Sequence, residues 1–166
     1  MPESDAAGCT GRLGMESFLA PTFITHAVRC KIDRDTGVVR VLDVAASHDC
    51  GRILNPIGAN GQVEGGVVMG IGMALTEGTL LDEDGRQRNP HLLDYKLQTM
   101  SDSPPIKIHF VEIDTPNAGP MGSKGIGEPP CVPTPGAVAN AIRKITGRRI
   151  DRLPMTPERV WEAMQP

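Results

Sequence analysis

Aromatic residues are scarce in this sequence of 166 residues, at 3% of the chain. Apolar residues of all kinds make up 39%, so a core has to be built from valine, isoleucine, leucine, methionine and alanine. Glycine and proline, with 19 and 15 copies, predict many loops without reaching low-complexity values. The length suits one domain or two small lobes, and with so few large side chains we expect the chain to need a partner subunit.

Two further absences narrow the class of protein. The net charge of −3 and the lack of a basic patch argue against a nucleic-acid partner. The most apolar run, residues 65–75, is too short and too rich in glycine to span a membrane, and the acidic first residues do not form a secretory signal. We therefore expect a cytoplasmic protein without a membrane partner.

The sequence also lacks a recognisable set of metal ligands. The four cysteines are scattered, without a C-x-x-C pair or the spacing of an iron–sulfur ligand set. We interpret them as reduced thiols, mostly buried. The four histidines share no ligand spacing, and His26 and His109 lie inside strand patterns, so we predict no metal held by protein side chains. The glycine-rich stretches match neither a dinucleotide fingerprint nor a phosphate-binding P-loop.

Local patterns predict an α+β fold. Residues 23–32 and 38–44 alternate apolar and polar side chains around a turn at 33–37, which predicts a β-hairpin. Residues 80–87 indicate a strand end with an Asp-Gly turn, and the alternation of residues 106–113 predicts a further strand. Together with three helices, this order predicts a small mixed sheet with packed helices. Residues 1–20 are expected to form a flexible N-terminal arm, which leaves residues 21–166 for the domain.

Helical periodicity is clearest from residue 57 to about residue 76, where Val63, Val67 and Ile71 recur on one side. Glycines line up on the same helix, at Gly58, Gly61, Gly65 and Gly72. Each interior glycine costs roughly 1 kcal/mol relative to alanine, so we expect another backbone or a cofactor to approach closely. Gln62, near the start of this helix, is either a surface residue or a hydrogen-bonding partner.

Two shorter helices are expected near the end of the chain. An apolar stripe over residues 137–145 predicts the first, with Gly147 as its stop. Thr156 as cap and Pro157 in the first position predict the second, which would run to Met164 and pack Val160 and Trp161 together with that methionine.

Residues 122–130 are the centre of the functional interpretation. Three glycines leave the backbone open to a ligand, Glu128 follows them, and Pro129 and Pro130 restrict the chain behind it. Such a loop can present N–H donors and one positioned acid, whose desolvation would favour a general base. The alternative is a solvated turn with Glu128 in water, and composition alone favours that alternative. A Ser123–Lys124 nucleophile is not favoured, because the S-x-x-K spacing is missing.

The sequence Gly-Ser-Lys-Gly-Ile-Gly-Glu-Pro-Pro at 122–130 resembles the catalytic loop of the molybdenum hydroxylases, the xanthine dehydrogenase and aldehyde oxidase family. Further segments resemble this family in the same order, at residues 31–41, 48–56, 61–66, 137–142 and 153–160. The resemblance runs from about residue 22 to the end, and the ordered combination of motifs makes it specific. It favours the catalytic interpretation of the loop.

The resemblance implies the fold of the C-terminal molybdopterin-binding domain of these enzymes. Glu128 matches the catalytic base, which takes a proton from a molybdenum-bound hydroxide while an aldehyde or N-heterocycle is hydroxylated with water as oxygen source. Gln62 matches a glutamine that lies against the molybdenum–pterin cofactor, either Mo-molybdopterin or its cytosine dinucleotide. The backbone N–H groups that help to hold the cofactor match those of Ser123, Lys124, Gly125, Ile126 and Gly127. The pterin, not the protein, supplies the sulfur ligands of the metal.

The resemblance also implies partners, because a complete molybdenum-binding subunit is several times longer than this chain. Electrons leave through the pterin to iron–sulfur clusters and usually FAD on other domains or subunits. We therefore expect a partial catalytic subunit that acts on a small-molecule substrate together with the remaining molybdenum-binding subunit, an iron–sulfur subunit and an FAD subunit. The alternative is a truncated or assembly domain that keeps the fold but is inactive without the missing half.

Overall fold

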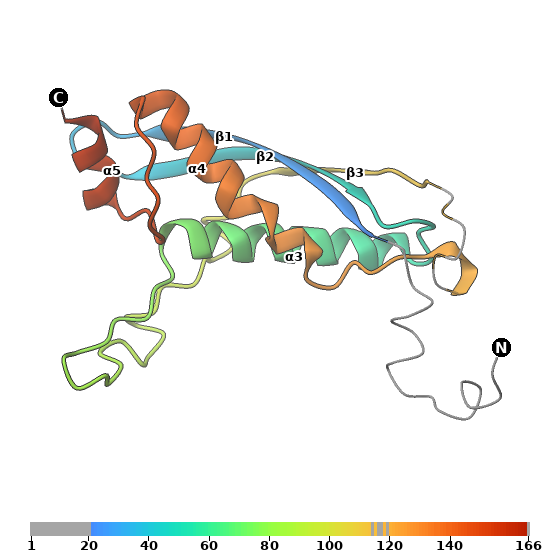
Figure 1. Cartoon of the computed structure of the whole chain (residues 1–166), viewed down its shortest axis with the longest axis horizontal. Helices are drawn as coiled ribbons and strands as arrows, with labels where there is room; N and C mark the ends of the chain where they lie inside the picture. Colours follow the sequence, from blue (N-terminus) through green and yellow to red (C-terminus); the bar gives the residue numbers. More distant parts are fainter. Residues whose placement is uncertain (1–20, 114, 116–117, 119, 166) are drawn as a thin grey trace.

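A three-stranded sheet forms one layer of the molecule, and helices cover one of its faces (Figure 1). The computed structural model describes residues 21–113, 115, 118 and 120–165, so the N-terminal arm predicted over residues 1–20 lies outside the described residues. Strands β1 (Phe23–Ile32) and β2 (Val39–Asp49) pair in antiparallel orientation, and β3 (Ile106–Phe110) pairs with β2 in parallel orientation. The predicted hairpin and the mixed sheet are both confirmed.

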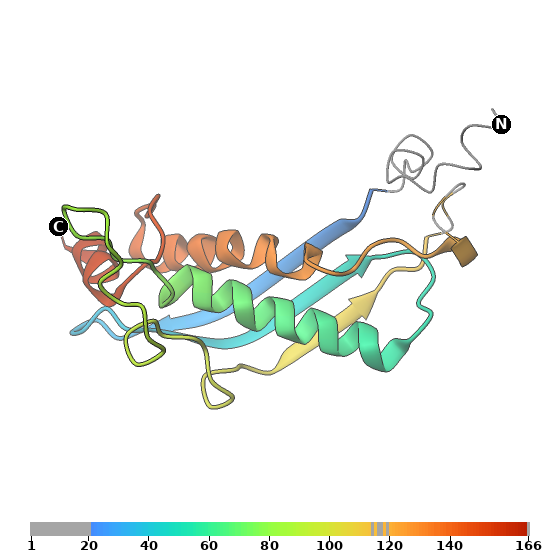
Figure 2. The ribbon, with the colours of Figure 1, turned by 90° about the horizontal axis from the view of Figure 1, so that it is seen from below.

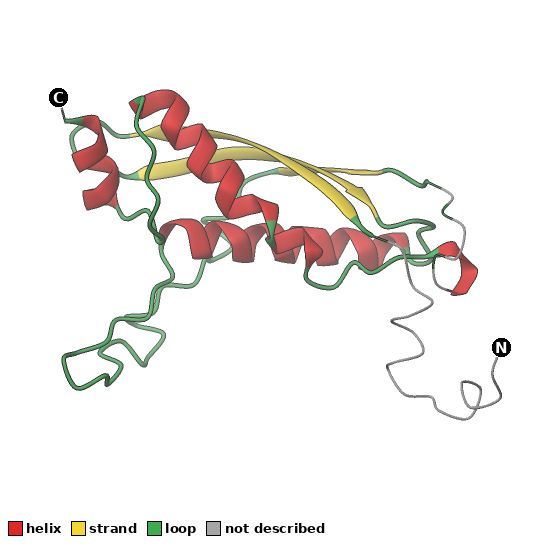
Figure 3. Cartoon of the chain, viewed as in Figure 1, coloured by secondary structure: helices red, strands yellow, loops and turns green. Residues whose placement is uncertain are grey.

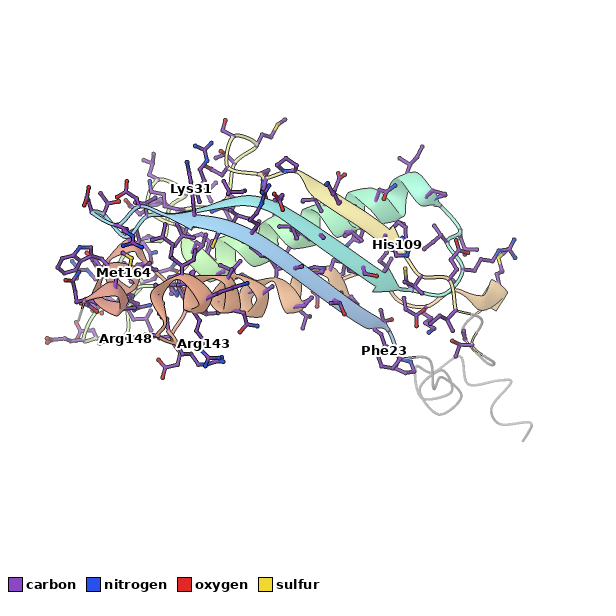
Figure 4. The ribbon with its side chains drawn as sticks, turned by 90° about the horizontal axis from the view of Figure 1, so that it is seen from above. Phe23, Lys31, His109, Arg143, Arg148 and Met164 are labelled. Atoms are coloured by element: carbon purple, nitrogen blue, oxygen red, sulfur yellow. The ribbon has the colours of Figure 1, made fainter. Side chains whose placement is uncertain are left out.

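Helices α3 (Pro56–Leu75) and α4 (Pro133–Thr146) lie side by side against the same face of the sheet (Figure 2). Helix α5 (Pro157–Met164) packs against α4, and two single 3-10 turns, η1 (Pro120–Gly122) and η2 (Pro129–Cys131), precede α4. The opposite face of the sheet is uncovered and carries the exposed side chains of Phe23, Lys31 and His109 (Figure 4). None of the described helices is long and apolar enough to cross a lipid bilayer.

The helix ends follow from local signals. The Asn55 side chain caps α3 by accepting a 3.0 Å hydrogen bond from the Gly58 N–H, and Pro56 occupies the first turn. Gly147 ends α4 in the left-handed conformation at φ 76°, as predicted for the helix stop. Helix α4 nevertheless begins at Pro133, four residues before the predicted apolar stripe, because its first turn is built on prolines.

The strand boundaries differ from the prediction at β2 and β3. Strand β2 continues to Asp49 rather than residue 44, because it lies between two partner strands that supply backbone hydrogen bonds where side-chain alternation is weak. Strand β3 ends at Phe110 rather than residue 113, although the Val111 N–H still donates to the His48 carbonyl at 2.8 Å. Over residues 80–87 the described chain forms only an isolated bridge between Leu81 and Gln87, not a strand.

The core lies between the sheet and the two long helices. Its fully buried members come from every layer, and they include Val44, Val63, Val67, Ile71, Val138, Ile142, Met155 and Val160. Of the side chains predicted to pack from α5, Val160 is fully buried, whereas Trp161 is 42% exposed. That part of the prediction is wrong, because α5 is a short terminal helix with only one face against the body.

The connection between α3 and β3, residues 76–105, is a long loop that extends away from the body (Figure 3). Its base is held by the buried Asn89, whose side chain accepts from the Leu80 N–H at 2.9 Å and donates to the Gly78 carbonyl at 2.6 Å. Further out the loop exposes large apolar side chains, among them Leu92, Leu93 and Met100.

Candidate functional site

Two loops meet beside the N-terminal end of α3, residues 49–52 and residues 122–124. The Lys124 N–H donates to the Cys50 carbonyl at 2.8 Å, and the Arg52 N–H donates to the Gly122 carbonyl at 2.9 Å. Between these bonds Gly51 and Ser123 form an antiparallel bridge. Gly51 has a φ of +62°, and a Cβ atom there would lie 2.3 Å from the Gly122 carbonyl oxygen, so the contact requires glycine.

A buried ion pair fixes the same junction. The Lys124 Nζ donates to Asp49 Oδ2 at 2.7 Å, and the two side chains are only 2% and 6% exposed. The other carboxylate oxygen of Asp49 accepts from the Gly51 N–H at 3.2 Å. Lys124 was predicted to contact the cofactor through its backbone, but its N–H and its ammonium group are both bonded within the chain. Burial, together with the nearby charge of Asp49, raises the pKa of the Cys50 thiol.

Helix α3 contributes Gln62, which the sequence singled out. The Gln62 side-chain amide donates to the Gly127 carbonyl and so joins the first turns of α3 to the end of the glycine-rich loop. At the other end of the loop, the Thr22 hydroxyl donates to the Gly125 carbonyl at 3.1 Å. Both contacts use loop carbonyls, and neither uses a loop N–H group.

A cavity of about 370 Å³ opens between these elements. It is lined by residues of both loops and of α3: Cys50, Arg52, Ile53, Leu54, Asn55, Gly58, Ala59, Gln62, Ser123, Lys124, Ile126 and Gly127. The structure thus brings Gln62 together with four of the five predicted loop residues. Gly125 and Glu128 are not among the lining residues. Arg52 is an exposed cation at the cavity, and the sequence patterns do not single it out.

The outer part of the loop presents unused donors. Among the described residues, the N–H groups of Gly125, Ile126 and Gly127 have no hydrogen-bond acceptor. Successive backbone N–H groups without an acceptor can donate to an anion or a carbonyl oxygen of a ligand. These three residues therefore have backbone donors available for a ligand.

The backbone of Glu128 is hydrogen-bonded, whereas its side chain is exposed. The Cys131 N–H donates to the Glu128 carbonyl at 3.0 Å, and Pro130 is buried against Gly66 of α3. The carboxylate itself is exposed, and none of the described elements covers it. The desolvation expected of this carboxylate is therefore not supplied by the described part of the chain.

The half-buried His26 joins the buried His48 and Thr134 in a polar chain next to the site, which the sequence patterns did not predict. His26 Nε2 lies 3.0 Å from His48 Nε2, and His26 Nδ1 lies 2.9 Å from the Thr134 hydroxyl. Burial, with the neighbouring His48, lowers the pKa of His26 to about 4, and burial lowers the pKa of His48. The hairpin register could have indicated this contact. His26 pairs with Ala46, and His48 is therefore the diagonal neighbour of His26 on the same face of the sheet.

The described residues contain no group of three or more histidine, cysteine, aspartate or glutamate side chains placed to hold a metal ion. Cys30, Cys50 and Cys131 are free thiols, of which Cys50 is buried and the other two are half-buried. Cys9 lies outside the described residues.

Comparison with known proteins connects this geometry to a family of enzymes. Residues 8–104 match the family model described as molybdopterin cofactor-binding domain. The chain is 43% identical over 161 residues to the putative xanthine dehydrogenase molybdenum-binding subunit XdhA of Escherichia coli (strain K12), covering 92% of this chain and 21% of that protein. It is 41% identical over 142 residues to the nicotine 6-hydroxylase large subunit of Paenarthrobacter nicotinovorans, covering 83% of this chain and 17% of that protein.

Solved structures share the fold. Quinoline 2-oxidoreductase from Pseudomonas putida 86 matches with a TM-score of 0.79 at 36% sequence identity, covering 84% of this chain and 18% of that chain. This chain therefore spans about a fifth of the length of the relatives that it matches.

Proposed function

Because this chain belongs to the molybdopterin cofactor-binding domain family, we propose that it forms one wall of the active site of a molybdenum hydroxylase, with Glu128 as the general base. The observation that carries this proposal is the cavity beside α3, where Gln62 and the glycine-rich loop meet directly before Glu128. The chain spans about a fifth of its relatives, so the activity belongs to a larger assembly.

The residues at the cavity fit a molybdenum–pterin cofactor, as Mo-molybdopterin or its cytosine dinucleotide. The free N–H groups of Ile126 and Gly127, which line the cavity, and of the adjacent Gly125 would hold its polar edge, with Gln62 and Ser123 beside them. Arg52 offers a cation for a phosphate group at the same cavity. When bound, the cofactor would accept the two electrons of the reaction, and this chain would supply orientation and proton transfer.

The role proposed for Glu128 is proton transfer. In the net reaction, one C–H bond of an aldehyde or N-heterocycle becomes C–OH with oxygen from water, and two electrons and two protons are released. Glu128 would take up a proton from the water-derived nucleophile as the new C–O bond forms. Pro129 and Pro130 restrict the backbone directly after Glu128. Pro130 packs against Gly66, which lies on the same helix as Gln62.

The assembly would contain the remaining part of the molybdenum-binding subunit and carriers that pass the electrons onward, iron–sulfur clusters and FAD. Two relatives are a putative molybdenum-binding subunit and a hydroxylase large subunit, which favours such an assembly. The free thiols of the described chain favour a reducing compartment such as the cytoplasm. The alternative is a non-catalytic assembly domain, which would keep the fold without turnover.

The test is the substitution Glu128→Gln in the complex purified from the native host, with Glu83→Gln on the exposed loop as control. Loss of a general base lowers the rate about 10²- to 10⁴-fold, while the molybdenum content stays near that of the unmodified complex. Loss of molybdenum together with activity would make Glu128 structural. If neither molybdenum nor a larger subunit accompanies the chain, the non-catalytic alternative holds.

A further inference from the structure

Helix α3 has an outer face that nothing in the described chain covers (Figure 2). Ile57, Gly61, Gly65 and Met69 follow one another at intervals of four residues, which places them on one side of the helix. Ile57 is 87% exposed and Met69 is 54% exposed. A Cβ atom added at Gly61 or Gly65 would meet nothing within 4 Å. We call these four residues the outer face of α3.

Helix α3 carries little charge, although its exposed residues include the polar Asn60, Gln62 and Glu64. Among its 20 residues, Pro56 to Leu75, Glu64 is the only charged side chain. A surface helix normally carries several charged residues on its solvent side, and α3 has one. The exposure of the outer face therefore conflicts with the residues that form it.

Glycines on the inner side of the same helix provide an internal comparison. A Cβ atom at Gly66 would lie 2.5 Å from Pro130 Cβ, and one at Gly70 would lie 2.5 Å from Thr134 Cβ. These two glycines are required because η2 and α4 pass directly over them. Gly61 and Gly65 carry the same helix-destabilising cost without a contact in the described chain. A close crossing by another polypeptide would supply that contact.

We propose that the outer face of α3 is the docking surface for the remainder of the molybdenum-binding polypeptide, which crosses α3 at Gly61 and Gly65. We identify the occupant from the length of the relatives that this chain leaves unmatched and from the position of the face beside the cavity. The inference rests on the proposed function. About four fifths of each matched relative has no counterpart in this chain. The face also adjoins the cavity, which Gly58 and Gln62 of the same helix line, so a segment seated there would close the open side of the site.

The experiment uses the tagged chain expressed in its native host, with co-purifying chains identified by mass spectrometry. The variants Gly61→Leu and Gly65→Leu put a large side chain where the crossing is closest. The matched control is Gly136→Leu, because Gly136 is also an exposed helical glycine with nothing within 4 Å of an added Cβ. We expect each α3 variant to lower recovery of the larger molybdenum-binding polypeptide at least tenfold, with the control unchanged.

A second measurement needs no substitution. Oxidation of Met69 by hydrogen peroxide, followed by mass spectrometry, reports whether its side chain is covered. We expect sulfoxide formation at Met69 to be at least fivefold slower in the complex than in the isolated chain. An equal rate in both would overturn the proposal, as would full recovery of the larger polypeptide by both α3 variants or no association at all. A dimer of this chain alone that Gly65→Leu dissociates would also overturn it, because a second copy would then be the occupant.

The outcome for docking is separable from the outcome for the proposed function. A complex that depends on the outer face but contains no molybdenum supports the docking surface and contradicts the enzyme. A molybdenum-containing, active complex in which Met69 is oxidised at the isolated-chain rate supports the enzyme and contradicts the docking surface.

Discussion

The two sides of helix α3 differ in how complete they are. On the inner side Val63 and Val67 are fully buried, and Gly66 and Gly70 are in contact with η2 and α4. On the outer side equivalent glycines face open space beside exposed apolar side chains. Glycine on the inner side of α3 is thus required by packing within this chain. Glycine on the outer side has no such contact among the described residues.

Polar groups follow the same division. Beneath the site, Asp49 and Lys124 are buried as a pair, and His26 is bonded to His48 and Thr134. On the outer surface the Glu128 carboxylate is exposed, and among the described residues the N–H groups of Gly125, Ile126 and Gly127 have no acceptor. The buried polar contacts therefore hold the glycine-rich loop in place, and the exposed carboxylate and free N–H groups remain available to a ligand.

Among the contacts that hold the glycine-rich loop, the Asp49–Lys124 pair should give the largest loss of stability when it is removed by Asp49→Ala. This substitution leaves the Lys124 ammonium buried without its counter-charge, and the free energy of unfolding should fall by about 3–5 kcal/mol. Urea denaturation of the chain measures the change. The control is Asp43→Ala, whose partner Arg29 is 72% exposed, and there the loss should stay below about 1 kcal/mol. Equal losses in the two variants would contradict a special role for the buried pair.

We expect a glycine-to-alanine substitution to lower the free energy of unfolding on the inner side of α3 and to raise it on the outer side. Gly70→Ala forces a Cβ atom against Thr134 and the Cys131 carbonyl, so we expect a loss of about 1–3 kcal/mol. Gly61→Ala meets no atom and should stabilise the isolated chain by up to about 1 kcal/mol through helix propensity. Denaturation midpoints of the two variants test this directly. A loss at Gly61 would mean that the outer face is packed within this chain.

The smallest effect near neutral pH is expected from the buried histidines. Because the pKa of His26 is lowered in the fold, the unfolded chain binds more protons between pH 6.5 and about 4. Stability is therefore complete above pH 6.5 and falls as the pH drops through this window, by less than about 1 kcal/mol per histidine between pH 7 and 6. Unfolding measured against pH in the His26→Gln variant should show a shallower loss. The matched control is His109→Gln, whose side chain lies on the uncovered face of the sheet.

Much of the fold could be predicted because it depends on neighbouring residues. Strand β1 and the turn after it follow from alternation and turn chemistry, and α3 follows from its periodicity. The prediction failed where partners decide the outcome. Strand β2 is extended by its two neighbours, and Trp161 is left exposed because too little of the chain reaches α5.

The candidate site divides in the same way. The sequence pointed to Gln62 and the glycine-rich loop, and the structure places them at one cavity. It gave no indication that Asp49 and Lys124, 75 residues apart, form a buried pair. Neither residue carries a local pattern that could reveal the other, because an ion pair between distant residues depends on how two loops are brought together.

The sequence by itself determined the hairpin, the end of α4 at Gly147 and the order of motifs that places the chain in its family, since each of these is encoded within a short stretch. Only the tertiary structure decided which glycines are covered and which remain open. Gly66 and Gly65 are neighbours in the sequence, yet one lies under Pro130 and the other under nothing in the described chain. The physical reason is that a glycine permits close approach without specifying what approaches, and that depends on the packing of the remaining elements.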